Sequence, residues 1–303
     1  MIPVSDQTVK QDVVYALARS TDAVYAARAS GLYRSNDEGR TWHYALASLE
    51  HPEPILVTAV AVCENTIFAG VKGAVLRSDN NGESWHMSAL ASPPPLVTAL
   101  ACSPNFAQDG FIAAATAEDG IFISIDRGQS WIAWNFGLID MNVCALAVSS
   151  DFTRDGVLFA GTESGIFRSH NGGRAWEEVD FPTDATPVLS LGLSPTFARD
   201  GVLFAGTETS GLFRSGDAGA SWQQVQSDFE GESINSIQFD VSQASRIWFL
   251  LDSKLLMTVD GQQFAEPYPG HFPPDSMATA LLCPNASHAP LVGFAEGDIL
   301  PLS

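Results

Sequence analysis

The chain has 303 residues, of which 46% are hydrophobic and 17% are charged, a balance typical of a folded protein rather than of a disordered one. Asp and Glu outnumber Lys and Arg by 35 to 15, which gives a formal net charge of −20. Such an acidic chain is a poor partner for nucleic acids and for anionic membrane surfaces. The sequence also has no apolar run of membrane-spanning length and no recognisable targeting segment, so we expect no membrane insertion and a cytoplasmic location.

One short motif returns six times along the chain, with a Ser or Thr, then an Asp or Asn, and a closing Trp or Phe. The closing aromatic residues lie 42 to 46 residues apart, which is the period of a four-stranded propeller blade. The copies are SNDEGRTW (35–42), SDNNGESW (78–85), SIDRGQSW (124–131), SHNGGRAW (169–176), SGDAGASW (215–222) and TVDGQQF (258–264).

Each motif has the composition of a hairpin turn. Its Asp or Asn can accept hydrogen bonds from turn amides, and its Gly tolerates a positive φ. We therefore predict a structural role for six side chains, namely Asp37, Asn80, Asp126, Asn171, Asp217 and Asp260.

Strand patterns fill the intervals between the motifs. Segments rich in Ala and Val begin at residues 13, 57, 97, 143, 188, 234 and 277, and they are predicted to be the innermost strands. Second strands such as 157–162 and third strands such as 165–169 are almost continuously apolar, as expected where both faces of a sheet are covered. The predicted blades are approximately 10–46, 56–89, 96–135, 142–180, 187–226, 233–268 and 277–303, within a single domain spanning 1–303.

The seventh blade lacks a motif and lacks material for a fourth strand. Residues 2–9 precede the first inner strand at a suitable distance, and we expect them to supply that strand and close the ring.

Neither a metal nor a cofactor is indicated. The four cysteines, Cys63, Cys102, Cys144 and Cys283, lie in apolar inner-strand segments without the spacing of zinc ligands, so buried free thiols are predicted rather than disulfides.

A further acidic repeat, xDG, closes the segments 106–110, 152–156 and 197–201; it is interpreted as a turn, with calcium binding as the alternative.

The motifs resemble the Ser-x-Asp-x-Gly-x-x-Trp repeats of the BNR, or Asp-box, superfamily, which includes sialidases, xyloglucan-degrading glycosidases, the sortilin ectodomain and a photosystem II assembly factor. The resemblance covers essentially the whole chain and implies an all-β fold, a single seven-bladed propeller of four-stranded antiparallel blades. It also implies that the motifs lie on the face away from the ligand site. Function is then expected on the opposite, acidic face, where the binding candidates are Glu118, Asp119, Glu163, Glu208, Asp252 and Glu296.

Two functions follow from the resemblance and the residues. The first is a non-catalytic binding or scaffolding propeller, expected to be a monomer, that recognises a protein, a peptide or a carbohydrate through the acidic loop face. The alternative is a glycan-active hydrolase or lyase that uses paired carboxylates at the channel mouth, with Glu163 and Glu208 as catalytic candidates. The binding function is favoured over catalysis for two reasons. Sialidases need three arginines that converge on the substrate, and this sequence places only Arg28 in the strand loops of the expected ligand face. The related glycosidases use two facing propellers, whereas this chain is long enough for one.

Overall fold

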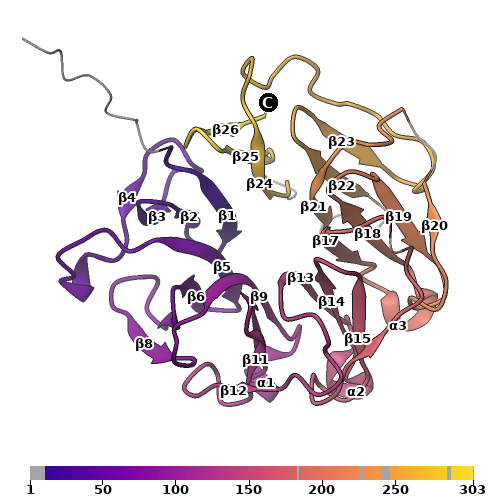
Figure 1. Cartoon of the computed structure of the whole chain (residues 1–303). Helices are drawn as coiled ribbons and strands as arrows, with labels where there is room; N and C mark the ends of the chain where they lie inside the picture. Colours follow the sequence, from indigo (N-terminus) through magenta and orange to yellow (C-terminus); the bar gives the residue numbers. More distant parts are fainter. Residues whose placement is uncertain (1–10, 183, 226–227, 241–245, 285–287, 303) are drawn as a thin grey trace, which may run out of the picture.

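The computed structural model describes residues 11–182, 184–225, 228–240, 246–284 and 288–302. Within these ranges seven antiparallel sheets follow one another around a central axis in the order of the sequence (Figure 1). The predicted all-β, seven-bladed propeller is therefore confirmed. The proposed closing strand, residues 2–9, lies outside the described residues.

Each blade is a meander in which sequential strands pair with one another. The first two blades contain β1 (Val14–Arg19), β2 (Val24–Arg28), β3 (Gly31–Ser35) and β4 (His43–Tyr44), then β5 (Val57–Cys63), β6 (Thr66–Val71), β7 (Ala74–Ser78) and β8 (His86–Ala89). The third and fourth contain β9 (Leu96–Cys102), β10 (Ile112–Ala117), β11 (Gly120–Ser124) and β12 (Ile132–Ala133), then β13 (Val143–Val148), β14 (Leu158–Thr162), β15 (Ile166–Ser169) and β16 (Glu177–Glu178). The last three contain β17 (Val188–Leu193), β18 (Leu203–Thr207), β19 (Leu212–Ser215) and β20 (Gln223–Gln224), then β21 (Ile234–Phe239), β22 (Ile247–Leu251) and β23 (Leu255–Thr258), then β24 (Ala278–Leu282), β25 (Leu291–Phe294) and β26 (Ile299–Pro301).

Four short helical turns complete the described secondary structure. A 3-10 turn, η1 (Ala47–Leu49), lies between the first two blades. Three single-turn helices, α1 (Phe106–Asp109), α2 (Phe152–Asp155) and α3 (Phe197–Asp200), join the first and second strands of the third, fourth and fifth blades. None of the helices in the described ranges has the length and apolar character needed to cross a bilayer.

The core lies between the blades, and this explains the apolar second strands. Every residue of β14 and of β18 is buried, because each sheet is covered on both faces by its neighbours. Aromatic side chains extend from one blade to the next, as in the edge-to-face contact of Phe159 with Phe197, whose ring centroids lie 5.7 Å apart.

All seven inner strands carry a register shift, the position of a β-bulge, at their second residue or, in β9, at their third. At several of these positions the side chain donates a hydrogen bond to the inner strand of the next blade. Thr58 donates to the carbonyl of Val97, and Thr279 donates to the carbonyl of Val14 at 2.6 Å. The second of these bonds joins the seventh blade to the first, so described residues already link the two ends of the ring.

The sixth blade departs from the prediction of four strands. After β23 its outer edge is reduced to a single bridge between Met257 and Ala265 in the described residues. The motif at 258–264 is one residue shorter than the others, and four prolines follow it within ten residues of Ala265. Because proline has no N–H to donate to a strand ladder, this segment cannot extend the pairing.

The prediction of four free thiols is wrong for two of the cysteines. Cys63 and Cys102 form a disulfide, with their Cα atoms 6.1 Å apart. They occupy the last positions of β5 and β9, and inner strands of neighbouring blades run side by side around the axis, so the two residues meet. Cys144 and Cys283 are free, as predicted.

Candidate functional site

The six repeated motifs form compact turns, called here the repeat turns, between the third and fourth strand positions of their blades. In the fifth blade the Ser215 hydroxyl donates to Asp217 Oδ1 at 2.8 Å and also accepts the Gly219 N–H at 2.9 Å. The Ser221 N–H and hydroxyl donate to the two oxygens of Asp217 at 2.9 and 2.6 Å. The carboxylate is thus fully engaged in its own turn.

These bonds have an electrostatic consequence. The Thr41 hydroxyl and amide lower the pKa of Asp37 to about 2, and the Ser221 hydroxyl and amide lower the pKa of Asp217 to about 2. A carboxyl whose pKa is lower in the folded state than in the unfolded chain stabilises the fold above the unfolded value, near 4, and this contribution is lost as the pH falls toward 2.

We therefore expect the double variant Asp37→Asn/Asp217→Asn to melt at nearly the wild-type temperature at pH 7, because Asn80 and Asn171 already fill the same place in two other turns. Between pH 4 and pH 2 the variant should lose less stability than the wild type. Thermal unfolding across that range measures the difference, with Glu83→Gln as a control in an exposed part of a repeat turn. Equal acid losses in the variant and the wild type would contradict the assignment.

The aspartates that close the 106–110, 152–156 and 197–201 segments also serve local structure. Asp155 accepts hydrogen bonds from the Ser149 hydroxyl at 2.6 Å and from the Val157 N–H at 2.9 Å. Asp200 has the same pair of contacts with Ser194 and Val202. Across the described ranges no group of three or more His, Cys, Asp or Glu side chains is arranged to hold a metal ion, so the structure gives the calcium alternative no support.

The antiparallel meander assigns every loop to one of two faces. The repeat turns and the turns between first and second strands lie together on the repeat-turn face, and the loops between second and third strands lie with the inter-blade connections on the loop face. The loop face carries the following described carboxylates: Asp12, Glu50, Glu53, Glu118, Asp119, Asp140, Glu163, Asp180, Asp184, Glu208, Asp228, Glu230, Glu232, Asp252, Glu266, Asp275, Glu296 and Asp298.

Few cations oppose them. In the described parts of the chain the loop face has Arg28, Lys72 and Lys254, whereas the other described arginines lie toward the repeat-turn face. Arg28 pairs with Asp12 at 3.4 Å, and Lys254 pairs with Glu232 at 2.8 Å. The excess negative charge of the protein is therefore concentrated on the loop face.

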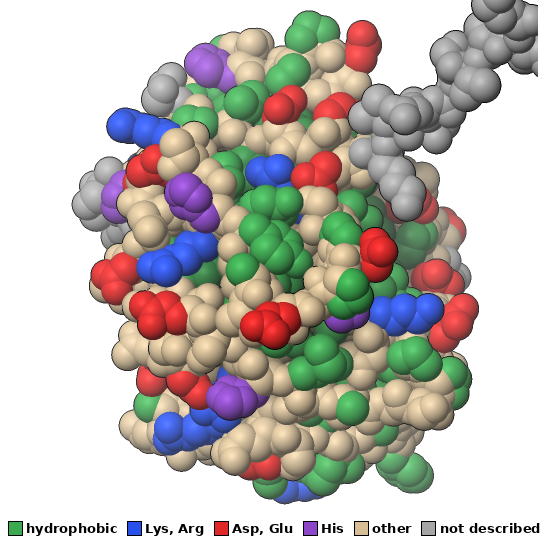
Figure 2. Space-filling view, turned by 90° about the vertical axis from the view of Figure 1, so that its left-hand side faces the viewer, with side chains coloured by type: hydrophobic (Ala, Val, Ile, Leu, Met, Phe, Trp, Pro, Cys, Tyr) green, Lys and Arg blue, Asp and Glu red, His purple; other side chains and the backbone are tan. Residues whose placement is uncertain are grey.

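The outer wall of the ring is different. Viewed from the side of the first two blades, acidic, basic and histidine side chains are interspersed with apolar ones (Figure 2). On this side of the ring the charged side chains of the two signs are mixed.

The predicted residues of the third and fourth blades come together around Asn142, in the connection to the fourth blade. Its amide Nδ2 donates to Glu163 Oε2 at 3.2 Å, and its Oδ1 accepts the Glu118 N–H at 3.0 Å. Asp140 accepts the Asn142 N–H at 2.9 Å and the Ser164 N–H at 2.8 Å. Asn142 thus fixes two neighbouring acidic loops relative to each other.

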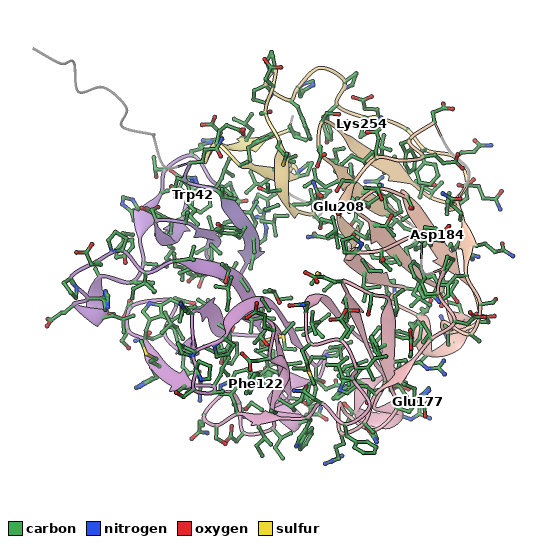
Figure 3. All side chains as sticks on the ribbon, viewed as in Figure 1. Trp42, Phe122, Glu177, Asp184, Glu208 and Lys254 are labelled. Atoms are coloured by element: carbon green, nitrogen blue, oxygen red, sulfur yellow. A yellow bond between two sulfur atoms is a disulfide. The ribbon has the colours of Figure 1, made fainter. Side chains whose placement is uncertain are left out.

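Glu208 completes this group from the fifth blade, where it lies beside the central axis (Figure 3). Burial, together with the negative charges of Glu163, Asp140 and Glu208, raises the pKa of Cys144 to about 11. The thiol therefore stays protonated at neutral pH and is a poor nucleophile. Glu118, Glu163 and Glu208 are all exposed to solvent, and we refer to these three as the acidic row.

The other predicted binding residues lie apart from the acidic row. Asp252 is half-buried and accepts a hydrogen bond from the Asn235 amide at 2.8 Å, so it helps to hold the sixth blade. The backbone carbonyl of Asp119 accepts the Asn135 amide at 3.0 Å. Glu296 is exposed on the seventh blade, which the fifth and sixth blades separate from the fourth.

A hollow of about 750 Å³ on the loop face lies between the first two blades, and neither its shape nor its aromatic residue was predicted. Asp12 and Glu53 contribute carboxylates to its lining, and Tyr15 and Leu56 are 40% and 37% exposed there. Tyr15 stands at the bulge position of the first inner strand, where most other blades carry smaller side chains. That contrast within the repeat is the signal by which Tyr15 could have been found.

Comparisons with known proteins match the fold alone. No protein-family model matches the chain, and no curated protein matches its sequence. Among solved structures, YCF48 bound to D1 peptide is 17% identical with a TM-score of 0.72, and the match covers 98% of this chain and 94% of that one.

Two longer solved structures match to a similar degree. The GH74 xyloglucanase from Xanthomonas campestris is 16% identical with a TM-score of 0.73, and the match covers 96% of this chain and 52% of that chain. The extracellular domain of a one-component system from B. thetaiotaomicron is 14% identical with a TM-score of 0.71, with 96% of this chain and 38% of that chain covered. The present chain thus spans about half of the enzyme and less than half of the sensor domain.

Proposed function

We propose that the chain is a non-catalytic propeller that binds a basic segment of a peptide or protein on its loop face. The concentration of carboxylates on that face, against three described cations of which two are paired, carries the proposal. A partner with Lys or Arg side chains would be attracted over roughly the Debye length of about 8 Å at physiological salt. We also infer that the repeat turns are Asp boxes of the BNR type, which hold the blades while the loops make contact.

The acidic row gives this surface a direction. Glu118, Glu163 and Glu208 occupy the second-to-third strand loops of three successive blades, so an extended cationic segment crossing these blades would meet them in turn. Asn142 and Asp140 hold the first two loops in place, which limits the conformational entropy lost on binding. The hollow beside Tyr15 offers an aromatic surface on the same face, suited to a guanidinium or an apolar side chain.

The comparison with solved structures supports a peptide as the occupant. A propeller of the same size and similar fold, YCF48, has been solved with the D1 peptide bound. At 17% identity, the likeness to YCF48 concerns the architecture and does not extend to the sequence of the bound peptide. The basic character of the proposed partner therefore rests on the charges of the present chain.

The test is a fluorescence-anisotropy titration with labelled peptides of equal length that are basic, neutral or acidic. The variant Glu118→Gln/Glu163→Gln/Glu208→Gln should weaken binding of the basic peptide by about tenfold, since three exposed ion pairs at roughly 0.2–1 kcal/mol each contribute roughly 0.6–3 kcal/mol together. The matched control is Asp22→Asn/Glu83→Gln/Glu177→Gln, which removes the same charge from exposed positions outside the loop face. Equal losses in both triple variants, or no preference for the basic peptide, would refute the proposal.

A further inference from the structure

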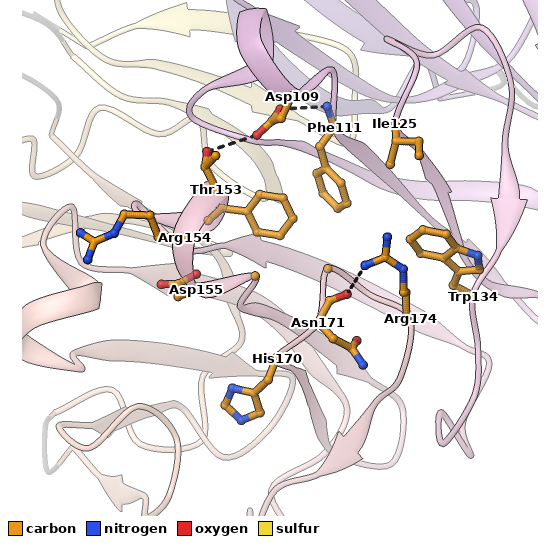
Figure 4. A pocket seen from close by; sticks show the side chains of 13 residues that line it. Asp109, Phe111, Ile125, Trp134, Thr153, Arg154, Asp155, His170, Asn171 and Arg174 are labelled. Carbon is orange, nitrogen blue, oxygen red and sulfur yellow. Dashed lines mark hydrogen bonds between the residues drawn. The ribbon is translucent and has the colours of Figure 1, made fainter.

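A second recess lies on the other side of the ring, between the third and fourth blades. It has a volume of about 450 Å³ and is lined from the repeat-turn face by α2, by two repeat turns and by the end of the outer strand of the third blade (Figure 4). Its apolar part is formed by Phe111 and Phe152, whose ring centroids are 4.2 Å apart, together with Ile125. None of the residues of the acidic row lines it.

A stacked guanidinium supplies the main polar feature of this recess. Arg174 lies over the Trp134 ring, 4.9 Å from its centroid, and one of its nitrogens donates to the Asn171 carbonyl at 3.1 Å. The guanidinium points toward the space in front of Phe111 and Ile125 (Figure 4). Stacking on an indole fixes the plane of the guanidinium and leaves its other N–H groups directed to the recess.

The two aspartates of the recess, Asp109 and Asp155, already accept hydrogen bonds from groups within the protein. Asp109 accepts the Phe111 N–H at 3.0 Å and the Ser103 hydroxyl at 2.6 Å. Asp155 is engaged by Ser149 and Val157. Arg174 donates one N–H to Asn171 and has further N–H groups for a ligand, whereas Arg154, on the rim, is paired with Asp151 at 3.0 Å. Arg174 is therefore the main donor that the recess offers.

The surroundings favour a macromolecular ligand over a small molecule. Ile125 is 58% exposed, and Ile132 and Phe136, two residues before and after Trp134, are 53% and 81% exposed. Apolar side chains this exposed around a polar-rimmed recess are typical of a contact surface for another chain.

We propose that this recess, which is separate from the loop-face site, docks a partner segment in which a large apolar side chain adjoins a carboxylate. The apolar side chain packs on exposed Ile125, above the buried rings of Phe111 and Phe152, and the carboxylate accepts hydrogen bonds from the Arg174 guanidinium. An acidic, hydrophobic segment is complementary to these groups, whereas a basic segment meets the guanidiniums of Arg174 and Arg154. The propeller would then hold chemically opposite segments on its two faces.

The probe is a short Gly/Ser peptide with a central Phe-Glu pair, titrated into the full chain with NMR detection. Saturable binding is expected, and Arg174→Gln should weaken it by about tenfold through loss of the charge-assisted bonds. Arg199→Gln, an exposed arginine next to the equivalent Asp of the fifth blade, is the matched control and should leave binding unchanged. Ile125→Ser, at a position that is 58% exposed and outside the core, should also weaken binding.

Three results would overturn the proposal. One is the absence of saturable binding at millimolar peptide, another is equal binding of a Phe-Lys peptide, and the third is an equal response of the Arg174 and Arg199 variants. Self-association abolished by Arg174→Gln would assign the recess to a second copy of the chain instead. Binding of the basic peptide to the loop face should be unaffected by Arg174→Gln, so failure here is distinguishable from failure of the proposed function.

Discussion

Removal of the bond between Cys63 and Cys102 by the variant Cys63→Ala/Cys102→Ala is expected to destabilise the oxidised protein by about 4 kcal/mol. The bond joins residues separated by 39 positions, and the loop-closure entropy of an unfolded chain of that length accounts for this amount. In a chain of this size each kcal/mol changes the melting temperature by roughly 2–4 °C, so a decrease of about 10 °C is expected.

Calorimetry of the oxidised protein, with and without reductant, measures this effect. Reductant should lower the melting temperature of the wild type and leave the double variant unchanged. The variant Cys144→Ala/Cys283→Ala, which removes the free thiols, is the matched control and should keep its response to reductant. Alkylation of all four cysteines in the unreduced, denatured protein would show that the bond does not form.

A second large effect is expected at the junction between the last and first blades. A Cβ atom added at Gly293 would lie 2.5 Å from Val14 Cγ1 and 2.8 Å from Val14 Cβ. Since Val14 belongs to the first inner strand and is fully buried, the two blades must separate to accommodate Gly293→Ala. Overpacking of this kind costs about 1–3 kcal/mol.

Chemical denaturation of Gly293→Ala checks this expectation. Gly165→Ala is the control, because a Cβ there meets only the Glu178 carboxylate oxygen at 3.9 Å. The double variant Gly293→Ala/Val14→Ala should recover part of the loss, since it removes the clashing methyl groups. If Gly293→Ala and Gly165→Ala have equal stabilities, the junction does not have the packing described above.

The sequence was most informative where structure is determined locally. The Ser, Asp and Gly residues of the repeat turns bond to one another within five positions, so their pattern is visible in the chain and sets the blade period. The predicted strands agree with the observed ones to within about a residue, as for 157–162 against β14. The motif of the sixth blade predicts a fourth strand, but the prolines that follow the motif prevent the pairing of that strand.

Contacts between blades were harder to predict. Cys63 is the seventh residue of VTAVAVC and Cys102 is the sixth residue of VTALAC, so alignment of the repeats brings them one position apart on neighbouring inner strands. The spacing of zinc ligands does not reveal this disulfide, because the two cysteines are 39 residues apart in the sequence and meet only through the packing of neighbouring blades.

The same distinction applies to the candidate site. Glu118, Glu163 and Glu208 follow the repeat and were found from it. Asn142, which joins two of their loops, lies in an inter-blade connection, where length and sequence vary from blade to blade. Arg174 was missed because the recess needs Trp134 from the preceding blade, and no pattern within one blade reveals that partner.

Hydrogen exchange with and without a bound basic peptide tests the central claim most directly, because it locates the binding face without any substitution. The account predicts added protection in the loops 117–119, 140–142, 163–164 and 208–210, and unchanged exchange in the repeat turns. Protection confined to the repeat turns, with no change in those loops, would contradict it.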